Sequence, residues 1–164
     1  MSPNQRRLAY LAGALFLIST RPTLSANSPE PRAPSTKDRC LLCGMLVAPH
    51  AAWVSQLQFE NGTTAYFDGN KCLFRYLLSR EKFAPELQKE KISATYVTTY
   101  YDLGKIALED AWFVVGSDVK GPMGHELVPF RTHDEADDFM ADHNGQRIVR
   151  ATDVNGEILA TLKK

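Results

Sequence analysis

The sequence predicts an α+β fold made of two fused ββαβ units. The main observation is that stretches typical of strands and helices follow in the same order, strand, strand, helix, strand, in each half of the folded region. Composition agrees, because 164 residues with 44% hydrophobic and 23% charged residues suit one compact domain or two small fused ones. We therefore predict one domain over residues 40–164, with a first unit at about 40–105 and a second at about 106–155.

The first unit is predicted from a hairpin, a helix and a third strand. Residues 52–60 alternate apolar and polar side chains, which is typical of a half-buried strand. The Asn-Gly pair that follows is the strongest short hairpin signal, so residues 63–67 are predicted to return as the second strand. Apolar residues at helical spacing predict a helix over 69–82. The β-branched and aromatic residues 92–101 predict the third strand.

Two further strands, residues 111–117 and 126–130, are predicted to open the second unit. Pro129 cannot donate a hydrogen bond to a neighbouring strand, so it indicates an edge strand or a bulge. A loop rich in Gly and Pro connects the two strands, and it carries Met123 and His125.

A helix over residues 133–143 and a strand over 147–154 complete the second unit. Thr132 and Glu135 have the spacing of a capping box, which marks the start of this helix. Gly145 is predicted to provide its C-terminal stop.

An export signal is predicted over residues 1–26. Two arginines precede the apolar stretch LAYLAGALFLIS, and TLSA offers a small-residue cleavage site. An uncleaved anchor is the alternative, because a leucine stands where such sites favour a small residue. The Pro/Ser-rich residues 27–39 are predicted to form a flexible linker. The rest of the chain has no apolar span long enough for a transmembrane helix.

Composition and motifs exclude several classes of function. The formal net charge is zero, so the chain lacks the basic footprint of a nucleic-acid-binding protein. Three cysteines are too few for a disulfide framework. The sequence contains no nucleophile elbow, phosphate-binding loop or suggestive carboxylate pair. We therefore expect neither an enzyme nor a stable small-molecule substrate.

The motif CLLCGM, residues 40–45, permits a redox pair, half a zinc site or a copper site. A redox pair needs its first thiol at a helix N-terminus, but Gly44 and Pro49 interrupt any helix here. Structural zinc needs four ligands, and the chain has no second C-x-x-C pair. A thiol at Cys43 beside the thioether of Met45 is a soft pair of the kind that selects Cu(I).

A second group of soft ligands lies in the loop VKGPMGHEL. Met123 and His125 are flanked there by Gly and Pro, so Met123 has no amphipathic face on which it would serve as core. Met140, by contrast, lies on the apolar face of the predicted second helix and is assigned to the core.

Three stretches together resemble the NosL family of nitrous-oxide reductase accessory proteins. They are CLLCGM, AWVSQLQFENGTTAYFDG and, as the most specific one, AWFVVGSDVKGPMGHELVPF. The likeness runs from about residue 40 to residue 144. It implies a periplasmic Cu(I)-binding protein with two ββαβ units, which agrees with the two halves described above.

The resemblance also implies ligands and partners. The soft ligands of the family fall on Cys43 and Met45 in the first half, and on Met123 and His125 in the second. Copper would pass to nitrous-oxide reductase through a membrane-bound, ABC-type maturation complex. Whether Cys40 is a third ligand, a redox partner or a bystander stays open.

The chain departs from the family pattern at two places. Family members are commonly lipoproteins with a cysteine directly after a lipobox, but no cysteine precedes Cys40 here, so we expect a soluble periplasmic protein. The family usually has an acidic residue where Cys72 stands, which puts this thiol outside the inherited site.

The resulting prediction is a non-catalytic periplasmic metallochaperone with Cu(I) as its cargo. The acceptor would be nitrous-oxide reductase or a related copper protein. The alternative is a periplasmic thiol–disulfide oxidoreductase that uses the Cys40/Cys43 pair.

Overall fold

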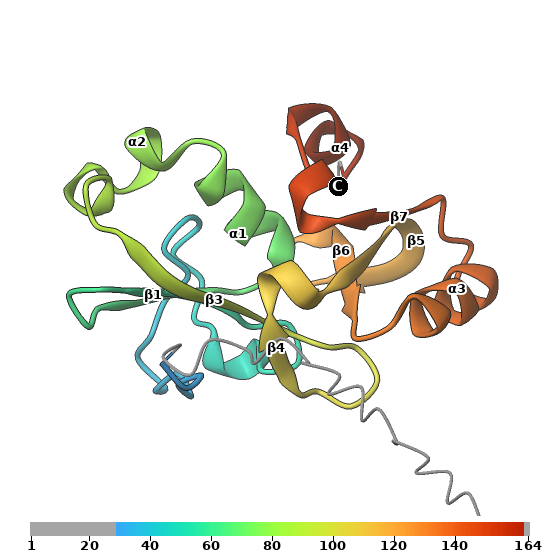
Figure 1. Cartoon of the computed structure of the whole chain (residues 1–164), viewed down its shortest axis with the longest axis horizontal. Helices are drawn as coiled ribbons and strands as arrows, with labels where there is room; N and C mark the ends of the chain where they lie inside the picture. Colours follow the sequence, from blue (N-terminus) through green and yellow to red (C-terminus); the bar gives the residue numbers. More distant parts are fainter. Residues whose placement is uncertain (1–28, 163–164) are drawn as a thin grey trace, which may run out of the picture.

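Two antiparallel sheets lie side by side in the structure, a computed structural model that describes residues 29–162 (Figure 1). Helix α1 (Asn70–Leu77) packs against strands of both sheets, and the short helix α4 (Gly156–Thr161) lies beside α1. The predicted export signal is outside the described residues. Within residues 29–162, no helix is both long and apolar enough to cross a membrane.

The first sheet has the strand order β2-β1-β3-β4, and every neighbouring pair is antiparallel. Its strands are β1 (Ser55–Phe59), β2 (Thr64–Phe67), β3 (Ile92–Thr98) and β4 (Lys105–Ala107). The predicted Asn-Gly hairpin joins β1 to β2, and Gly62 takes a φ of +84°, which glycine adopts without strain. The three residues of β4 are too few to give a periodic signal, so this strand was not predicted.

The predicted helix over 69–82 is divided in two. Helix α1 ends at Leu77, and α2 (Arg80–Phe83) follows after Ser79, whose φ and ψ of −153° and 45° are not helical. The guanidinium group of Arg80 donates to the carbonyls of Leu87 and Glu90, at 2.7 and 2.8 Å. With these two hydrogen bonds, the Arg80 side chain holds the segment that returns the chain to β3. This segment contains a 3-10 helix at Pro85–Leu87.

The second sheet has the order β6-β5-β7, again antiparallel throughout. Its strands are β5 (Trp112–Gly121), β6 (Gly124–Phe130) and β7 (Arg147–Arg150). Pro129 lies in the edge strand β6, as predicted. The β5–β6 hairpin is longer than predicted, because pairing resumes beyond a bulge and continues to Gly121 and Gly124.

Helix α3 (His133–Asp142) covers the second sheet, and its predicted capping box is confirmed. The prediction for its C-terminus was wrong in detail, since the positive φ belongs to Asn144 rather than to Gly145. Gly145 is needed for space instead, because a Cβ there would lie 2.5 Å from a methyl carbon of Val114.

The two halves share one topology. β1 lies between β2 and β3 just as β5 lies between β6 and β7, and a helix precedes the last strand of each unit. This arrangement confirms the prediction of two ββαβ units. The remaining elements are 3-10 helices at Ala48–His50, Leu108–Asp110 and Ala151–Asp153.

Most of the core is shared between the halves. One cluster of buried side chains runs from β1, β2 and α1 into the second sheet, while a smaller cluster lies under α3. Phe74 of α1 and Phe113 of β5 meet at the junction, edge to face, with ring centroids 5.3 Å apart. Apolar burial therefore joins the units.

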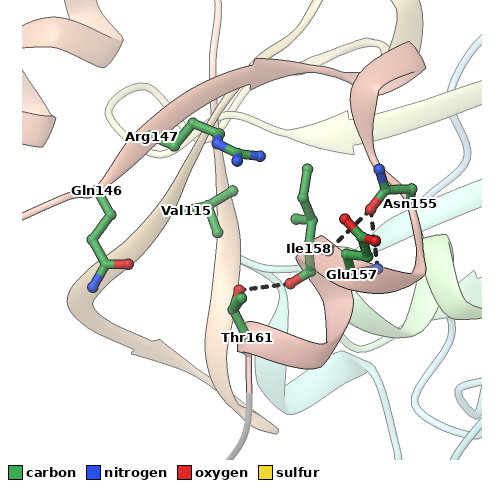
Figure 2. A pocket seen from close by; sticks show the side chains of 7 residues that line it. All are labelled: Val115, Gln146, Arg147, Asn155, Glu157, Ile158 and Thr161. Carbon is green, nitrogen blue, oxygen red and sulfur yellow. Dashed lines mark hydrogen bonds between the residues drawn. The ribbon is translucent and has the colours of Figure 1, made fainter.

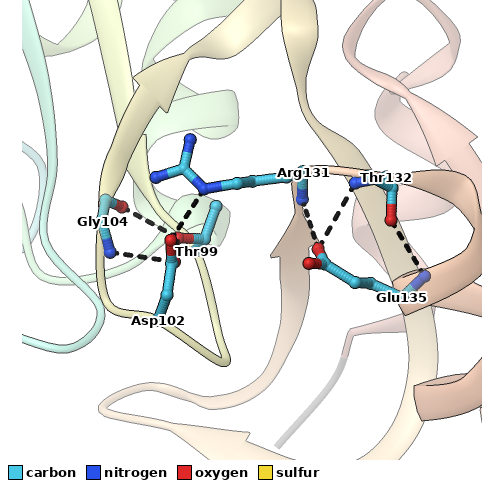
Figure 3. A network of polar contacts seen from close by, with 6 residues as sticks. All are labelled: Thr99, Asp102, Gly104, Arg131, Thr132 and Glu135. Atoms are coloured by element: carbon cyan, nitrogen blue, oxygen red, sulfur yellow. Dashed lines mark hydrogen bonds and ion pairs between the residues drawn. The ribbon is translucent and has the colours of Figure 1, made fainter.

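A polar network also bridges the halves at the surface (Figure 3). Arg131, at the end of β6, donates from Nε to Asp102 in the β3–β4 loop at 2.7 Å. Hydrogen bonds from Thr99 and Arg131 hold the pKa of the Asp102 carboxyl well below its usual range. The backbone N–H of Gly104 also donates to this carboxylate, at 3.1 Å.

Residues 29–39, assigned to a flexible linker in the sequence analysis, run along the first sheet. The buried amide of Gln56 bonds both the N–H and the carbonyl of Arg32, at 2.9 and 3.0 Å. Gln58 donates to the carbonyl of Glu30 at 2.8 Å. Buried amides need such partners, and the segment provides them for both ends of the Gln56 amide and for the amino group of Gln58, while Oε1 of Gln58 has no partner among the described residues.

Candidate metal centre

The motif CLLCGM forms a tight turn along the edge of the first sheet. The N–H of Cys40 donates to the carbonyl of Met45 at 2.8 Å, and Gly44 closes the turn with a φ of +77°. Cys40 also forms a parallel bridge with Tyr66 of β2. These bonds hold the turn next to the C-terminal end of β2.

Three thiols converge there with one carboxylate. Cys40, Cys43, Asp68 and Cys72 each offer one ligand atom, and these atoms all lie within 4.8 Å of one another. Cys40 and Cys72 are only 2% and 1% exposed, whereas Cys43 is exposed. We call these four residues the thiol cluster. It has a buried interior and one thiol at the surface.

Asp68 and Cys72 come from the corner between β2 and α1. Asp68 directly follows β2, and Cys72 is the third residue of α1. Neither was among the predicted ligands, and Cys72 had been placed outside the site. An acid and a thiol four residues apart at a strand-to-helix corner were visible in the sequence. Their proximity to Cys40 and Cys43 depends on the docking of the CLLCGM turn against β2.

The carboxylate of Asp68 is fully buried and only partly hydrogen-bonded. Its Oδ2 accepts a hydrogen bond from the Cys43 thiol at 3.4 Å, while its Oδ1 has no partner among the described residues. An unpaired buried carboxylate oxygen costs free energy. A cation held by the neighbouring sulfurs would lower this cost, so the donor set fits a metal ion.

Hydrogen bonds within the thiol cluster separate the pKa values of its thiols. The bond from the Cys72 thiol lowers the pKa of Cys40 to about 7, and the same bond raises the pKa of Cys72 together with burial. Partial burial raises the pKa of Cys43 to about 12, with Cys40 and Asp68 adding to the effect.

The two candidate methionines approach this region from different halves. Met45 is half-buried in the same turn as the first two thiols. Met123 lies at the tip of the β5–β6 hairpin and packs against the core cluster that contains Cys40 and Cys72. Its carbonyl accepts a hydrogen bond from Nζ of Lys71. The hairpin tip therefore lies at the first turn of α1, which carries Cys72.

His125 lies in β6 rather than in the loop where it was predicted. The longer hairpin pairs it with Lys120, and its Nδ1 is 3.2 Å from the carbonyl oxygen of Ser117. It is half-buried and is not part of the thiol cluster. The structure thus brings Cys40 and Cys43 together with Cys72, and it places His125 as the second residue of β6.

A side chain from the second half caps the first turn of α1. The N-cap residue, Gly69, has no side chain, and Glu126 Oε2 accepts a hydrogen bond from the N–H of Lys71 at 2.7 Å. A Cβ on Gly69 would lie 2.6 Å from the Glu126 carboxylate, so glycine leaves the room for it. Burial raises the pKa of Glu126 to about 7. Asn70 also donates to the carbonyl of Leu127, at 2.9 Å.

A cavity of about 410 Å³ lies elsewhere, between the second sheet and α4 (Figure 2). Its lining residues are Val115, Gln146, Arg147, Asn155, Glu157, Ile158 and Thr161. This lining contains no thiol, thioether or imidazole. The thiol cluster therefore reaches solvent through Cys43 and not through this cavity.

Two of the solved structures that are similar to this chain are NosL proteins. The chain is similar to the crystal structure of the copper chaperone NosL from Shewanella denitrificans, with 24% sequence identity and a TM-score of 0.64 over 78% of this chain and 97% of that one. It is also similar to the solution NMR structure of the apo-NosL protein from Achromobacter cycloclastes, with 28% identity and a TM-score of 0.45 over 64% and 87% of the two chains. No curated protein matches the chain.

The first of these likenesses shows a shared fold, which confirms the predicted α+β architecture. The model of the NosL family matches residues 31–159, which include both ββαβ units and the whole thiol cluster. The chain therefore belongs to the NosL family, as the motifs in its two halves predicted.

Proposed function

We propose that this protein binds Cu(I) and carries it to an acceptor protein, without catalysing a reaction itself. The observation that supports this role best is the convergence of three thiols on one buried carboxylate, with a single thiol exposed. The Shewanella denitrificans NosL, to which the chain is similar, is a copper chaperone, and this supports the same cargo here.

The donor set favours Cu(I) over harder ions. Thiolates and thioethers are soft ligands that select Cu(I), whereas oxygen-rich sites suit Mg²⁺ or Ca²⁺. With metal–sulfur bonds of about 2.3 Å, the length found for thiolates on zinc, three sulfurs around one ion lie about 4 Å apart. The ligand atoms of the thiol cluster already lie within 4.8 Å of one another, so a small adjustment would bring the sulfurs onto one ion.

Graded burial of the thiols suits a carrier. Cys43 at the surface can receive the ion from a donor and pass it to an acceptor by ligand exchange, while Cys40 and Cys72 hold it inside. Met45, half-buried in the same turn, and Met123 at the hairpin tip can add thioether ligands. Binding must release protons, because the thiols of Cys43 and Cys72 have raised pKa values.

The alternative, a thiol–disulfide oxidoreductase, receives less support from the geometry. Such enzymes need a thiolate that is both low in pKa and accessible. Here the thiol with the lowered pKa, Cys40, is buried, and the exposed thiol, Cys43, has a raised pKa. Cys40 also lies in a turn along β2 and not at a helix N-terminus.

We propose the periplasm as the compartment and nitrous-oxide reductase, loaded through a membrane-bound ABC-type complex, as the destination. Membership of the NosL family and the export signal predicted over residues 1–26 support both statements. A related copper protein is the second possible acceptor. Copper transfer from the loaded protein to the purified, copper-free maturation complex would distinguish the two.

Anaerobic titration tests copper binding itself. We expect one Cu(I) per chain in competition with a chromophoric Cu(I) chelator, and a weaker response to Zn(II). An insulin-reduction assay on the same preparation should show no activity above background. No competition for Cu(I) in the presence of reductant would refute the carrier role, and insulin reduction would favour the oxidoreductase.

A further inference from the structure

Lys71 is a buried cation at the junction of the two halves. Its side chain is only 4% exposed, and it forms none of the ion pairs found among residues 29–162. Its ammonium group donates instead to two carbonyls, one of Met123 at the hairpin tip and one of Leu162 at 3.5 Å. Burying an ammonium group is costly, so these contacts call for an explanation beyond general packing.

The backbone around Lys71 is held to the second half as well. Its own N–H donates to Glu126, and the neighbouring side chain of Asn70 donates to the carbonyl of Leu127. Within the hairpin, a Cβ on Gly121 would lie 2.4 Å from Cγ of Glu126, so glycine leaves room for the side chain that caps α1. Strand β6 is therefore attached to the first turn of α1 through Glu126 and Leu127, while the hairpin tip itself is attached through Lys71.

This junction determines where the sulfur of Met123 can lie. Cys72, the residue after Lys71, belongs to the thiol cluster, while Met123 is bound to Lys71 through its carbonyl. Ligands must be held within about 0.5 Å of their positions to bind a metal well. A hairpin tip without its ammonium partner would lose its main polar attachment to α1.

We propose that Lys71 is a positioning residue for copper binding: it holds the hairpin tip so that the Met123 thioether reaches an ion bound at the thiol cluster. The proposal rests on the Cu(I) binding proposed above. All the thiols of the cluster come from the first half, and Lys71 recruits a further ligand from the second. In this way the second ββαβ unit contributes a ligand to the copper site of the first.

Lys71→Leu is the direct test, because it removes the ammonium group and adds no sulfur near the thiol cluster. We expect Cu(I) affinity to fall about 10- to 100-fold, as is typical when a residue that orients a ligand is lost. Methyl NMR on ¹³C-methionine protein supplies a readout that stability alone would not change. In the wild type, Cu(I) should shift the methyl signal of Met123, and this shift should be lost in Lys71→Leu.

Three comparisons isolate the effect. The signal of Met140 in α3 should not move in either protein. Lys105→Leu is the matched control, because Lys105 is a partly buried lysine that also donates to a backbone carbonyl, that of Val54, and its side-chain hydrogen bonds go to Val54 and Thr98 rather than to the hairpin. Lys71→Arg should restore most of the affinity, since arginine can donate to the same carbonyls. If Lys71→Leu does not fold, Lys71→Gln carries the same expectation.

The outcomes separate this proposal from the proposed function. A Met123 shift that persists in a folded Lys71→Leu protein would overturn the positioning role and leave copper binding intact. Cu(I) binding to the wild type without any Met123 shift would also overturn it. A wild type that binds no Cu(I) would refute both. Loss of the Met123 shift in Lys71→Leu, but not in Lys105→Leu, supports the proposal.

Discussion

Burial assigns different tasks to the three thiols of the thiol cluster. Cys43 is accessible to a donor or an acceptor protein, whereas Cys40 and Cys72 are shielded from solvent and from external disulfides. Shielding matters in an oxidising compartment, because thiol–disulfide exchange requires access to a sulfur. Asp68 adds a hydrogen bond that orients the exposed thiol.

Single serine substitutions will show which thiols bind copper. We expect Cys43→Ser and Cys40→Ser each to weaken Cu(I) binding by about tenfold or more, and Cys72→Ser to do the same, because its sulfur lies in the same cluster. Chelator competition measures all three, with Met140→Leu as a control that removes a sulfur elsewhere. If Cys72→Ser left the Cu(I) affinity unchanged, Cys72 would not be a ligand, and only the ligands predicted from the sequence would remain.

At the scale of secondary structure, α1 depends on the second half for its first turn. Its N-cap is a glycine, and the buried carboxyl group of Glu126 substitutes for a capping side chain. Lys71 lowers the pKa of this carboxyl group and Asp68 raises it, but burial is the largest influence and raises it to about 7. The stability that Glu126 contributes as a cap should therefore change with pH around neutrality, which would not be expected of an exposed capping carboxylate.

This dependence can be measured with Glu126→Gln. Between about pH 4.5 and 7, the folded protein binds more protons at Glu126 than the unfolded chain does, so its free energy of unfolding falls as the pH rises. The loss attributable to this group amounts to at most about 3 kcal/mol.

We expect Glu126→Gln to remove this contribution to the pH dependence of the free energy of unfolding. Above pH 7, the stability of the variant relative to the wild type should therefore be higher than it is at acidic pH. Urea unfolding at a series of pH values is the measurement. Glu157→Gln, which replaces an exposed acid on α4, is the matched control. Parallel curves for the wild type and Glu126→Gln would contradict the expectation.

At the scale of the whole molecule, the two halves are joined both by a buried core and by a polar bridge at the surface. Phe113 is fully buried and packs on Phe74 across the junction. The ion pair of Arg131 and Asp102 has side chains that are 40% and 52% exposed, so solvent screens it. Apolar packing should therefore provide most of the free energy that holds the halves together.

Two substitutions test this division. Phe113→Ala should lower the free energy of unfolding by about 3–5 kcal/mol, because it leaves a cavity in the shared core. Asp102→Asn should lower it by no more than about 1 kcal/mol at neutral pH. Chemical denaturation measures both. A larger loss in Asp102→Asn than in Phe113→Ala would show that the surface network, and not the core, joins the units.

The sequence by itself was sufficient for features that depend on neighbours along the chain. The order of the two ββαβ units, the Asn-Gly hairpin, the edge position of Pro129 and the capping box at Thr132 are all confirmed. Each rests on interactions over a few residues, such as side-chain alternation or a cap, so local spacing is enough to predict it. The family was predicted for the same reason, because its motifs are contiguous. The export signal, the compartment and the acceptor stay predictions.

Tertiary structure alone decided the composition of the thiol cluster. Cys72 and Asp68 join Cys40 and Cys43 because the CLLCGM turn docks along β2, a contact between residues more than twenty positions apart. The role of Lys71 follows from the packing of one half on the other. Such contacts depend on how whole elements dock against one another, and local periodicity in the sequence does not predict this docking. The sequence therefore indicated soft ligands, and the docking of the CLLCGM turn along β2 determined which thiols meet.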